Sequence, residues 1–222
     1  MGWKPEIITE TGLQFFGKIS ASISHELKNV MAIVNENAGL LDDLTVMTER
    51  GRPLDPARLK LMAATVKKQV GRADEILKNM NRFAHSIDAI VAEVDLNQTI
   101  ELFMALTDRF IVMGGVKVDL QLPDRSLKIP TAPYFLINLL WLCLEFAMSA
   151  SGNDKQVALV AEEAGNSVVI RFQGLAGIAG KPPGTFPSDR EKNLLPVLEA
   201  DLTVDPQREE IVMRLSKKAG VI

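Results

Sequence analysis

Residues 16–44 read FGKISASISHELKNVMAIVNENAGLLDDL, and this stretch decides the fold because its apolar residues keep a seven-residue register. The seam comprises Phe16, Ile19, Ile23, Leu27, Val30, Val34, Leu41 and Leu44, with Asn37 filling one gap. The pattern predicts a helix from about residue 11 to residue 48, after a lead-in over residues 1–10. His25 is rotated by roughly 200° from the nearest seam residues on either side, so we expect its imidazole to face solvent.

The neighbours of His25 suggest that this histidine reacts. Glu26 can accept the ring N–H, which would fix the tautomer and leave the other nitrogen as a nucleophile, while Asn29 projects beside the ring. The same face carries small side chains that would let another protein approach closely. We expect partner contacts from Ala21, Ser22, Lys28 and Ala32. The alternative interpretation is an exposed histidine without a role.

A second helix follows a loop that contains Gly51 and Pro53, with Asp55 as N-cap and Pro56 as its first residue. Its predicted seam comprises Leu59, Met62, Val66, Val70, Ala73, Leu77, Met80, Ala84, Ile87 and Val91. One helix pair cannot cover both seams, so we expect a homodimeric four-helix bundle. Asn37 would then either fix the register or bind water at the edge, and His85, which lacks a following acid, is interpreted as a structural or surface residue.

From about residue 94 the pattern changes to mixed helices and strands, which predicts an α+β chain. Asn97 is the predicted N-cap of the first helix of this part. The expected helices span 97–113, 133–150 and 190–200, and the expected extended segments span 116–122, 127–129, 157–161, 168–172, 202–204 and 210–215. Residues 174–187 form a loop rich in glycine and proline.

The stretch Ser24-His25-Glu26-Leu27-Lys28-Asn29 resembles the phospho-acceptor motif of bacterial sensor histidine kinases. It departs from that family where Val30-Met31 replace Pro-Leu and continue the helix. The resemblance implies that His25 accepts a phosphoryl group, that Glu26 acts as base and that Asn29 can position a water. It also implies a dimerisation and phosphotransfer hairpin over residues 1–93 and an ATP-binding-like α/β sandwich over residues 94–222.

The nucleotide motifs of that family are missing from the second domain. Where the family has a magnesium-binding asparagine, this chain has Leu142-Cys143-Leu144-Glu145-Phe146, and Gln173 stands where an aspartate would read adenine. The segment 181–189, rich in proline, replaces the glycine-rich lid. Glu145 could bind a metal or simply be solvated or hydrogen-bonded. We therefore expect a degenerate domain without cofactor- or metal-binding residues. Any magnesium needed for phosphoryl transfer would be carried by the receiver domain of a partner protein.

Composition narrows the class of protein further. The 222 residues are 47% hydrophobic and 24% charged, typical of a folded protein, and the net charge of −3 argues against nucleic acid as a partner. Cys143 is the only cysteine and excludes an internal disulfide. The most apolar run, 134–148, is too short for a bilayer and contains Asn138 and Glu145. We expect a cytoplasmic protein without a membrane span.

The sequence as a whole resembles the stand-alone histidine phosphotransferases of bacterial phosphorelays. This resemblance implies transfer between the aspartates of response-regulator receiver domains through His25, without ATP. A phosphatase that uses Asn29 to hold water, a non-catalytic scaffold or inhibitor of a kinase or receiver, and a kinase with an unusual nucleotide site are alternatives.

Overall fold

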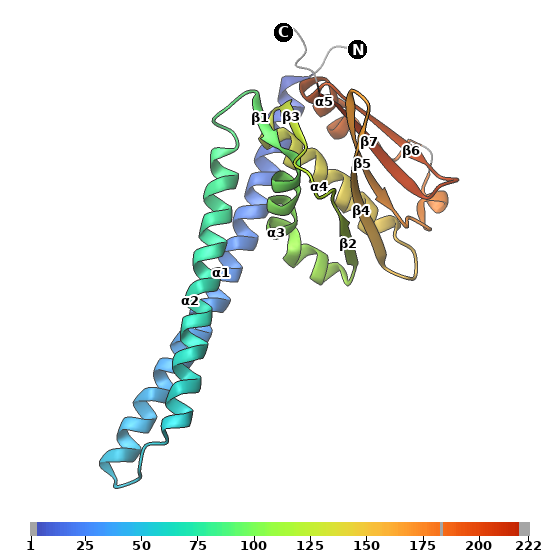
Figure 1. Cartoon of the computed structure of the whole chain (residues 1–222). Helices are drawn as coiled ribbons and strands as arrows, with labels where there is room; N and C mark the ends of the chain where they lie inside the picture. Colours follow the sequence, from blue (N-terminus) through green and yellow to red (C-terminus); the bar gives the residue numbers. More distant parts are fainter. Residues whose placement is uncertain (1–3, 183, 218–222) are drawn as a thin grey trace. The chain divides into compact units, whose positions relative to one another are not determined.

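The computed structural model describes residues 4–182 and 184–217, which form two compact units. One unit is Lys18–Arg82, and the other joins the described residues up to Gly17 with those from Phe83 onward. In chain order (Figure 1) the elements are α1 (Pro5–Glu49), α2 (Pro56–His85), β1 (Ala92–Asp95), α3 (Leu96–Gly114), β2 (Lys117–Gln121), β3 (Lys128–Thr131), α4 (Pro133–Ala150), β4 (Gln156–Ala164), β5 (Ser167–Gln173), the 3-10 turn η1 (Ile178–Gly180), α5 (Asp189–Leu198), β6 (Ala200–Asp205) and β7 (Glu210–Ser216). The predicted fold class, a helical hairpin followed by an α/β sandwich, is confirmed.

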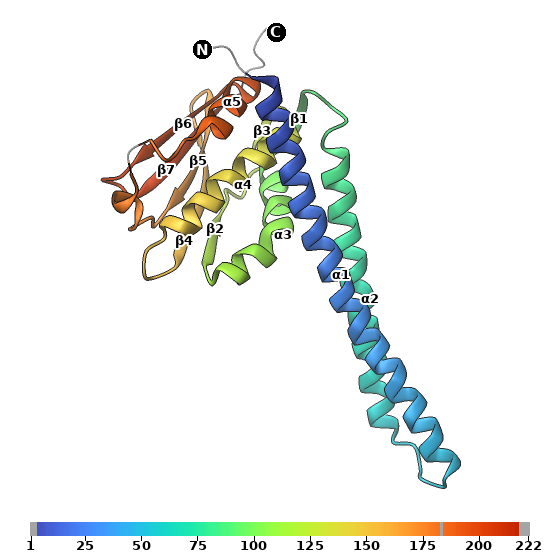
Figure 2. The same cartoon turned by 180° about the vertical axis from the view of Figure 1, so that it is seen from behind.

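The Lys18–Arg82 unit is an antiparallel pair formed by parts of α1 and α2 (Figures 1 and 2). The turn between them has the predicted chemistry, because Asp55 Oδ1 accepts the N–H of Ala57 at 2.9 Å and Pro56 opens α2. The buried apolar residues of this unit are Ile19, Ile23, Val30, Leu44 and Met62. Asn37 is also buried, and its amide donates to the Ile33 carbonyl at 2.8 Å, so its polarity is satisfied within α1.

The predicted start of α1 and the predicted end of α2 are wrong by several residues, whereas the end of α1 at Glu49 and the start of α2 at Pro56 agree with the prediction. α1 begins at Pro5 instead of near residue 11, because its first turns are packed: Phe15 is buried and the hydroxyl of Tyr134 donates to the Gly12 carbonyl. Phe15 therefore takes the buried position assigned to Phe16.

The C-terminal end of α2 lies earlier than predicted. The helix stops at His85, where the chain turns and the N–H of Ser86 donates to the Phe83 carbonyl at 3.1 Å. Ile87 and Val91, predicted to belong to the seam of α2, lie beyond the helix and are exposed.

The second unit is built on a five-stranded sheet of order β2-β4-β5-β7-β6, in which β2 is parallel to β4 and the other pairs are antiparallel. β1 and β3 form a separate antiparallel pair. Figure 2 shows α4 and α5 in front of the large sheet. Apolar residues alternate along β4, where Val157, Leu159 and Ala161 are buried, as expected for a sheet with one face against helices.

Helix α4 spans the predicted residues and is the centre of this unit. Most of its residues are buried, from Tyr134 to Ala150. It is long and apolar enough to cross a membrane by length and composition, but two thirds of its most apolar window, 67%, is buried inside the fold, as in a core helix. α3 begins differently from the prediction: Asp95 is its N-cap, whereas the Asn97 amide donates to the carbonyls of Pro123 and Arg125.

Candidate functional site

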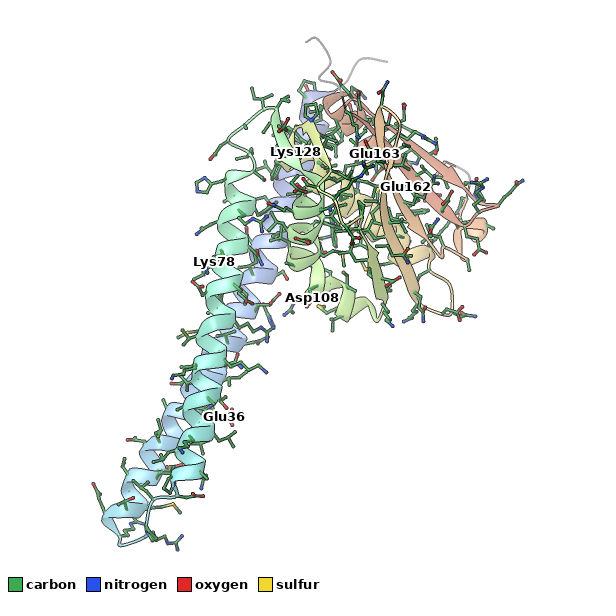
Figure 3. The ribbon with its side chains drawn as sticks, viewed as in Figure 1. Glu36, Lys78, Asp108, Lys128, Glu162 and Glu163 are labelled. Carbon is green, nitrogen blue, oxygen red and sulfur yellow. The ribbon has the colours of Figure 1, made fainter. Side chains whose placement is uncertain are left out.

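His25 lies on the exposed surface of α1, as the seam predicted. The helix continues through Val30 and Met31 without a break, so the ring is carried by regular helix on both sides. Charged side chains elsewhere on the hairpin, such as Glu36 of α1 and Lys78 of α2, are also exposed (Figure 3).

Of the two side chains next to His25, Asn29 lies beside the ring as predicted, whereas Glu26 makes a contact that the sequence did not predict. The amide nitrogen of Asn29 lies 3.2 Å from His25 Nδ1, which is hydrogen-bond distance across one helical turn. Glu26 instead faces α2, where its carboxylate lies 3.5 Å from a guanidinium nitrogen of Arg72. The structure thus gives the Nδ1 contact to Asn29 and gives Glu26 an ion pair between the two helices.

Arg72 was missed by the sequence reasoning. It lies nearer in sequence to the turn than Glu26 does, so counting equal distances from the turn would have paired Glu26 with another residue. A contact between two helices depends on how the helices pack, and the periodicity of either helix alone does not predict it.

Three of the four predicted partner-contact residues, Ala21, Lys28 and Ala32, are exposed on α1. Ser22 is only 5% exposed, so the prediction that it lies on the exposed face is wrong. Ser22 directly precedes the buried seam residue Ile23 on the helix, so its side chain lies at the edge of the apolar seam. Its hydroxyl has no hydrogen-bond partner among the described residues.

His85, the other histidine of the chain, is exposed, in agreement with its interpretation as a surface residue. Its Nδ1 lies 2.8 Å from Asp88 Oδ2. An ionised carboxylate can only accept a hydrogen bond, so this contact favours the tautomer of His85 with its proton on Nδ1.

The residues where the family would bind a nucleotide are engaged with one another. Leu142, in the stretch expected to correspond to the family's magnesium-binding asparagine motif, is 3% exposed. The carboxylate of Glu145 lies 3.8 Å from the guanidinium of Arg190 in α5, in agreement with its interpretation as a hydrogen-bonded or solvated acid. The ring of Phe146 stacks on that of Phe186, with ring centroids 4.4 Å apart. Among residues 4–182 and 184–217, no group of three or more His, Cys, Asp or Glu side chains could hold a metal ion.

Two further polar groups belong to this region. Glu191 is buried, and its carboxylate accepts both the N–H and the hydroxyl of Ser188 at 2.6 Å, a capping box that starts α5. Asn138, one turn before Leu142, is completely buried, and neither atom of its amide has a partner among the described residues. The sequence reasoning treated Asn138 only as an interruption of the apolar run, although an asparagine amid apolar residues is itself a signal.

The sequence matches no protein-family model, and it matches no curated protein. Several solved structures are similar in fold. They include the Acinetobacter baumannii histidine kinase AdeS (12% identity, 88% of this chain and 98% of that chain, TM-score 0.49), the histidine kinase ThkA in complex with the response regulator TrrA (16%, 93% and 63%, 0.46) and a bacterial phosphotransferase (16%, 90% and 95%, 0.41). These neighbours are histidine kinases, parts of histidine kinases or a phosphotransferase, at 12–16% identity and with TM-scores below 0.5.

Proposed function

We propose that this chain is a histidine phosphotransferase of two-component signalling, which moves phosphoryl groups between receiver-domain aspartates through His25 without binding ATP. The observation that carries the proposal is the exposed imidazole on regular helix, with Asn29 at 3.2 Å from Nδ1, inside a stretch that resembles a phospho-acceptor motif. We place this activity in the cytoplasm, where receiver domains act.

The chemistry asks little of the protein beyond position. A lone pair on Nε2 of His25 attacks the phosphorus of the aspartyl phosphate, the N–P bond forms, and the P–O bond to the aspartate breaks with its electrons returning to the carboxylate. Phosphoryl transfer depends mainly on alignment and charge compensation, and the receiver supplies its own magnesium. An exposed ring on a rigid helix lets a receiver approach in line.

The proposal that the chain does not bind ATP is supported by residues of α4, of β5 and of the segment before α5. A buried leucine cannot replace an oxygen ligand of magnesium, so Leu142 does not fit the metal. Gln173 replaces the adenine-reading carboxylate, and its amide already donates to Glu210 at 2.9 Å. The stacked pair Phe146–Phe186 adds an apolar contact in the same region.

Calorimetry with ATP and magnesium tests this part of the proposal. We expect a Kd no tighter than about 1 mM, equivalent to a binding free energy of about −4 kcal/mol. Binding in the micromolar range would show that the second domain holds nucleotide after all.

A homodimer is part of the proposal because apolar side chains remain exposed along the hairpin. Those more than two fifths exposed include Leu41, Leu61, Val70 and Leu77. A second copy of the hairpin would cover them in a four-helix bundle. Light scattering at low micromolar concentration should give twice the chain mass of 24.4 kDa, and Val70→Glu should lower it toward that of one chain. A monomeric wild type would contradict the bundle.

The transfer itself is tested with receiver domains phosphorylated by acetyl phosphate and taken from the same organism. Label should move to this chain in the wild type, and His25→Ala should abolish it. His85→Ala is the matched control, because His85 is an exposed histidine on the other helix and should keep full transfer. Equal labelling of the His25→Ala and wild-type proteins would refute the assignment.

A receiver phosphatase is the second candidate, favoured by the position of the Asn29 amide on the same exposed face. In that case label would leave the receiver as inorganic phosphate, and His25→Ala would retain part of the activity. If His25→Ala and wild type bind a receiver equally and neither moves phosphate, the chain is a scaffold.

A further inference from the structure

We propose that a hollow on the large sheet binds a small dipolar molecule, an α-amino acid with a polar side chain. The hollow has a volume of about 460 Å³, within the usual range of small-molecule sites, and lies over the beginnings of β2 and β4 and the end of β5. Its lining includes Lys117, Asp119, Gln156, Ala158, Gln173 and Gly174. This inference does not depend on the chemistry at His25.

The strand register places the polar side chains of the hollow on the face of the sheet opposite to α4 and α5. Val157 of β4 is buried against the helices, so its neighbours Gln156 and Ala158 point the other way. Ala158 is paired with Asp119 of β2 on one side and with Gln173 of β5 on the other. The small side chain of Ala158 therefore lies between longer polar ones and leaves room for a ligand above it.

Lys117 and Asp119 bring opposite charges to the hollow. Both are exposed and lie two residues apart on the same face of β2, which separates their backbones by roughly 7 Å. In the part of the chain that the structure describes, neither forms an ion pair, either with the other or with a third residue. The side-chain amide of Gln121 donates to Asp119 Oδ2 at 2.6 Å and so orients this carboxylate.

Gln173 supplies a hydrogen-bond acceptor whose orientation is fixed by a buried acid. Its Nε2 lies 2.9 Å from the carboxylate of Glu210, which is only 3% exposed. An ionised carboxylate can only accept, so the NH₂ group of Gln173 must face Glu210, and Arg171 donates to the other carboxylate oxygen at 2.9 Å. The carbonyl oxygen of Gln173 lies on the other side of the amide and has no donor among the described residues.

The two charges select the class of ligand. A phosphate or a nucleotide would bring its anionic groups close to the Asp119 carboxylate, and a diamine would bring a cation close to the Lys117 ammonium. An α-amino acid has both charges on groups attached to one carbon, so its carboxylate can accept from Lys117 while its ammonium donates to Asp119. An amide in its side chain can then donate to the Gln173 carbonyl and pair with the amide of Gln156.

Titration of the full-length protein with L-glutamine tests the proposal, with the backbone amide NMR signals of β2, β4 and β5 as the readout. We expect saturable shifts with a Kd of about 0.1–1 mM, because the hollow is open to solvent and a small ligand makes few contacts. N-acetyl-L-glutamine lacks the ammonium group and should bind about tenfold more weakly or less, the effect of losing one hydrogen bond between charged groups.

Substitutions in the hollow test the two charges separately. Lys117→Met and Asp119→Asn should each raise the Kd for L-glutamine about tenfold or more, because each removes one of the two charges. Lys192→Met removes an exposed lysine of α5 that does not line the hollow. It is the matched control and should leave the Kd unchanged.

Three results would overturn the proposal. The first is the absence of shifts in β2, β4 and β5 at about 20 mM L-glutamine. The second is equal affinity for L-glutamine and its N-acetyl derivative, and the third is an unchanged Kd in either Lys117→Met or Asp119→Asn. Phosphoryl transfer through His25 is measured separately, so each of these results leaves the proposed function standing.

Discussion

Phe83, near the C-terminal end of α2, is completely buried in the unit that contains the large sheet. Its ring lies 5.4 Å from Phe15 in an edge-on arrangement and 5.7 Å from each of Phe16 and Tyr134 in stacked arrangements. Phe83→Ala would remove all three aromatic contacts and leave a cavity. The expected loss of unfolding free energy is about 3–5 kcal/mol, the usual range for a buried Phe→Ala change.

For a chain of this length, 1 kcal/mol corresponds to a shift in Tm of about 2–4 °C, so Tm should fall by about 6–20 °C. Urea unfolding followed by circular dichroism measures the loss directly. Leu13→Ala is the control, since Leu13 is an exposed residue of α1, and it should change stability by no more than about 0.5 kcal/mol. A loss below about 1 kcal/mol for Phe83→Ala would show that this end of α2 is not part of the packed unit.

Three further predictions concern buried polar groups. Burial raises the pKa of Tyr134 to about 12, so the phenolate absorption of this only tyrosine should appear near pH 12, and a midpoint near pH 10 in the folded protein would contradict the burial. The contribution of Tyr134 to stability should be constant below about pH 10 and fall between pH 10 and pH 12. Burial, with the charge of Glu191, raises the pKa of the Cys143 thiol, so a thiol reagent should label native protein far more slowly than unfolded protein. Glu210→Ala should lower the free energy of unfolding, measured with urea, by about 1–3 kcal/mol, because Arg171 and Gln173 each donate to the buried Glu210 carboxylate at 2.9 Å. A change of less than about 0.5 kcal/mol would show that these contacts contribute little to stability.

Elements with strong local signals could be predicted from the sequence. α4 is bounded by Pro133 and by the end of a long apolar run, and Asp55-Pro56 set the start of α2. The beginning of α1 could not be predicted, because it depends on contacts with α4. Phe15 is buried rather than Phe16 because it packs near Trp141, a residue far away in sequence.

In the candidate site, too, some features follow from the local sequence and others depend on contacts between distant residues. The exposure of His25 follows from helical periodicity alone, and periodicity also places Asn29 beside it. Successive residues of a helix do not face each other, so Glu26 is turned away from the His25 ring, and its carboxylate lies 3.5 Å from Arg72 of α2 instead. A contact between two helices is set by their relative shift, and no local pattern encodes that shift.

The contacts at the start of α5 limit how far this part of the domain can open. An ATP-binding lid must open and close in each catalytic cycle, so it is drawn from the least stable parts of a fold. Here the Ser188–Glu191 capping box and the Phe146–Phe186 stack fix the start of α5. If the domain binds no nucleotide, as we propose, it has no use for such an opening. We then expect the backbone amides at the start of α5 to exchange with solvent about as slowly as those of the sheet, which would give this part of the domain one constant surface.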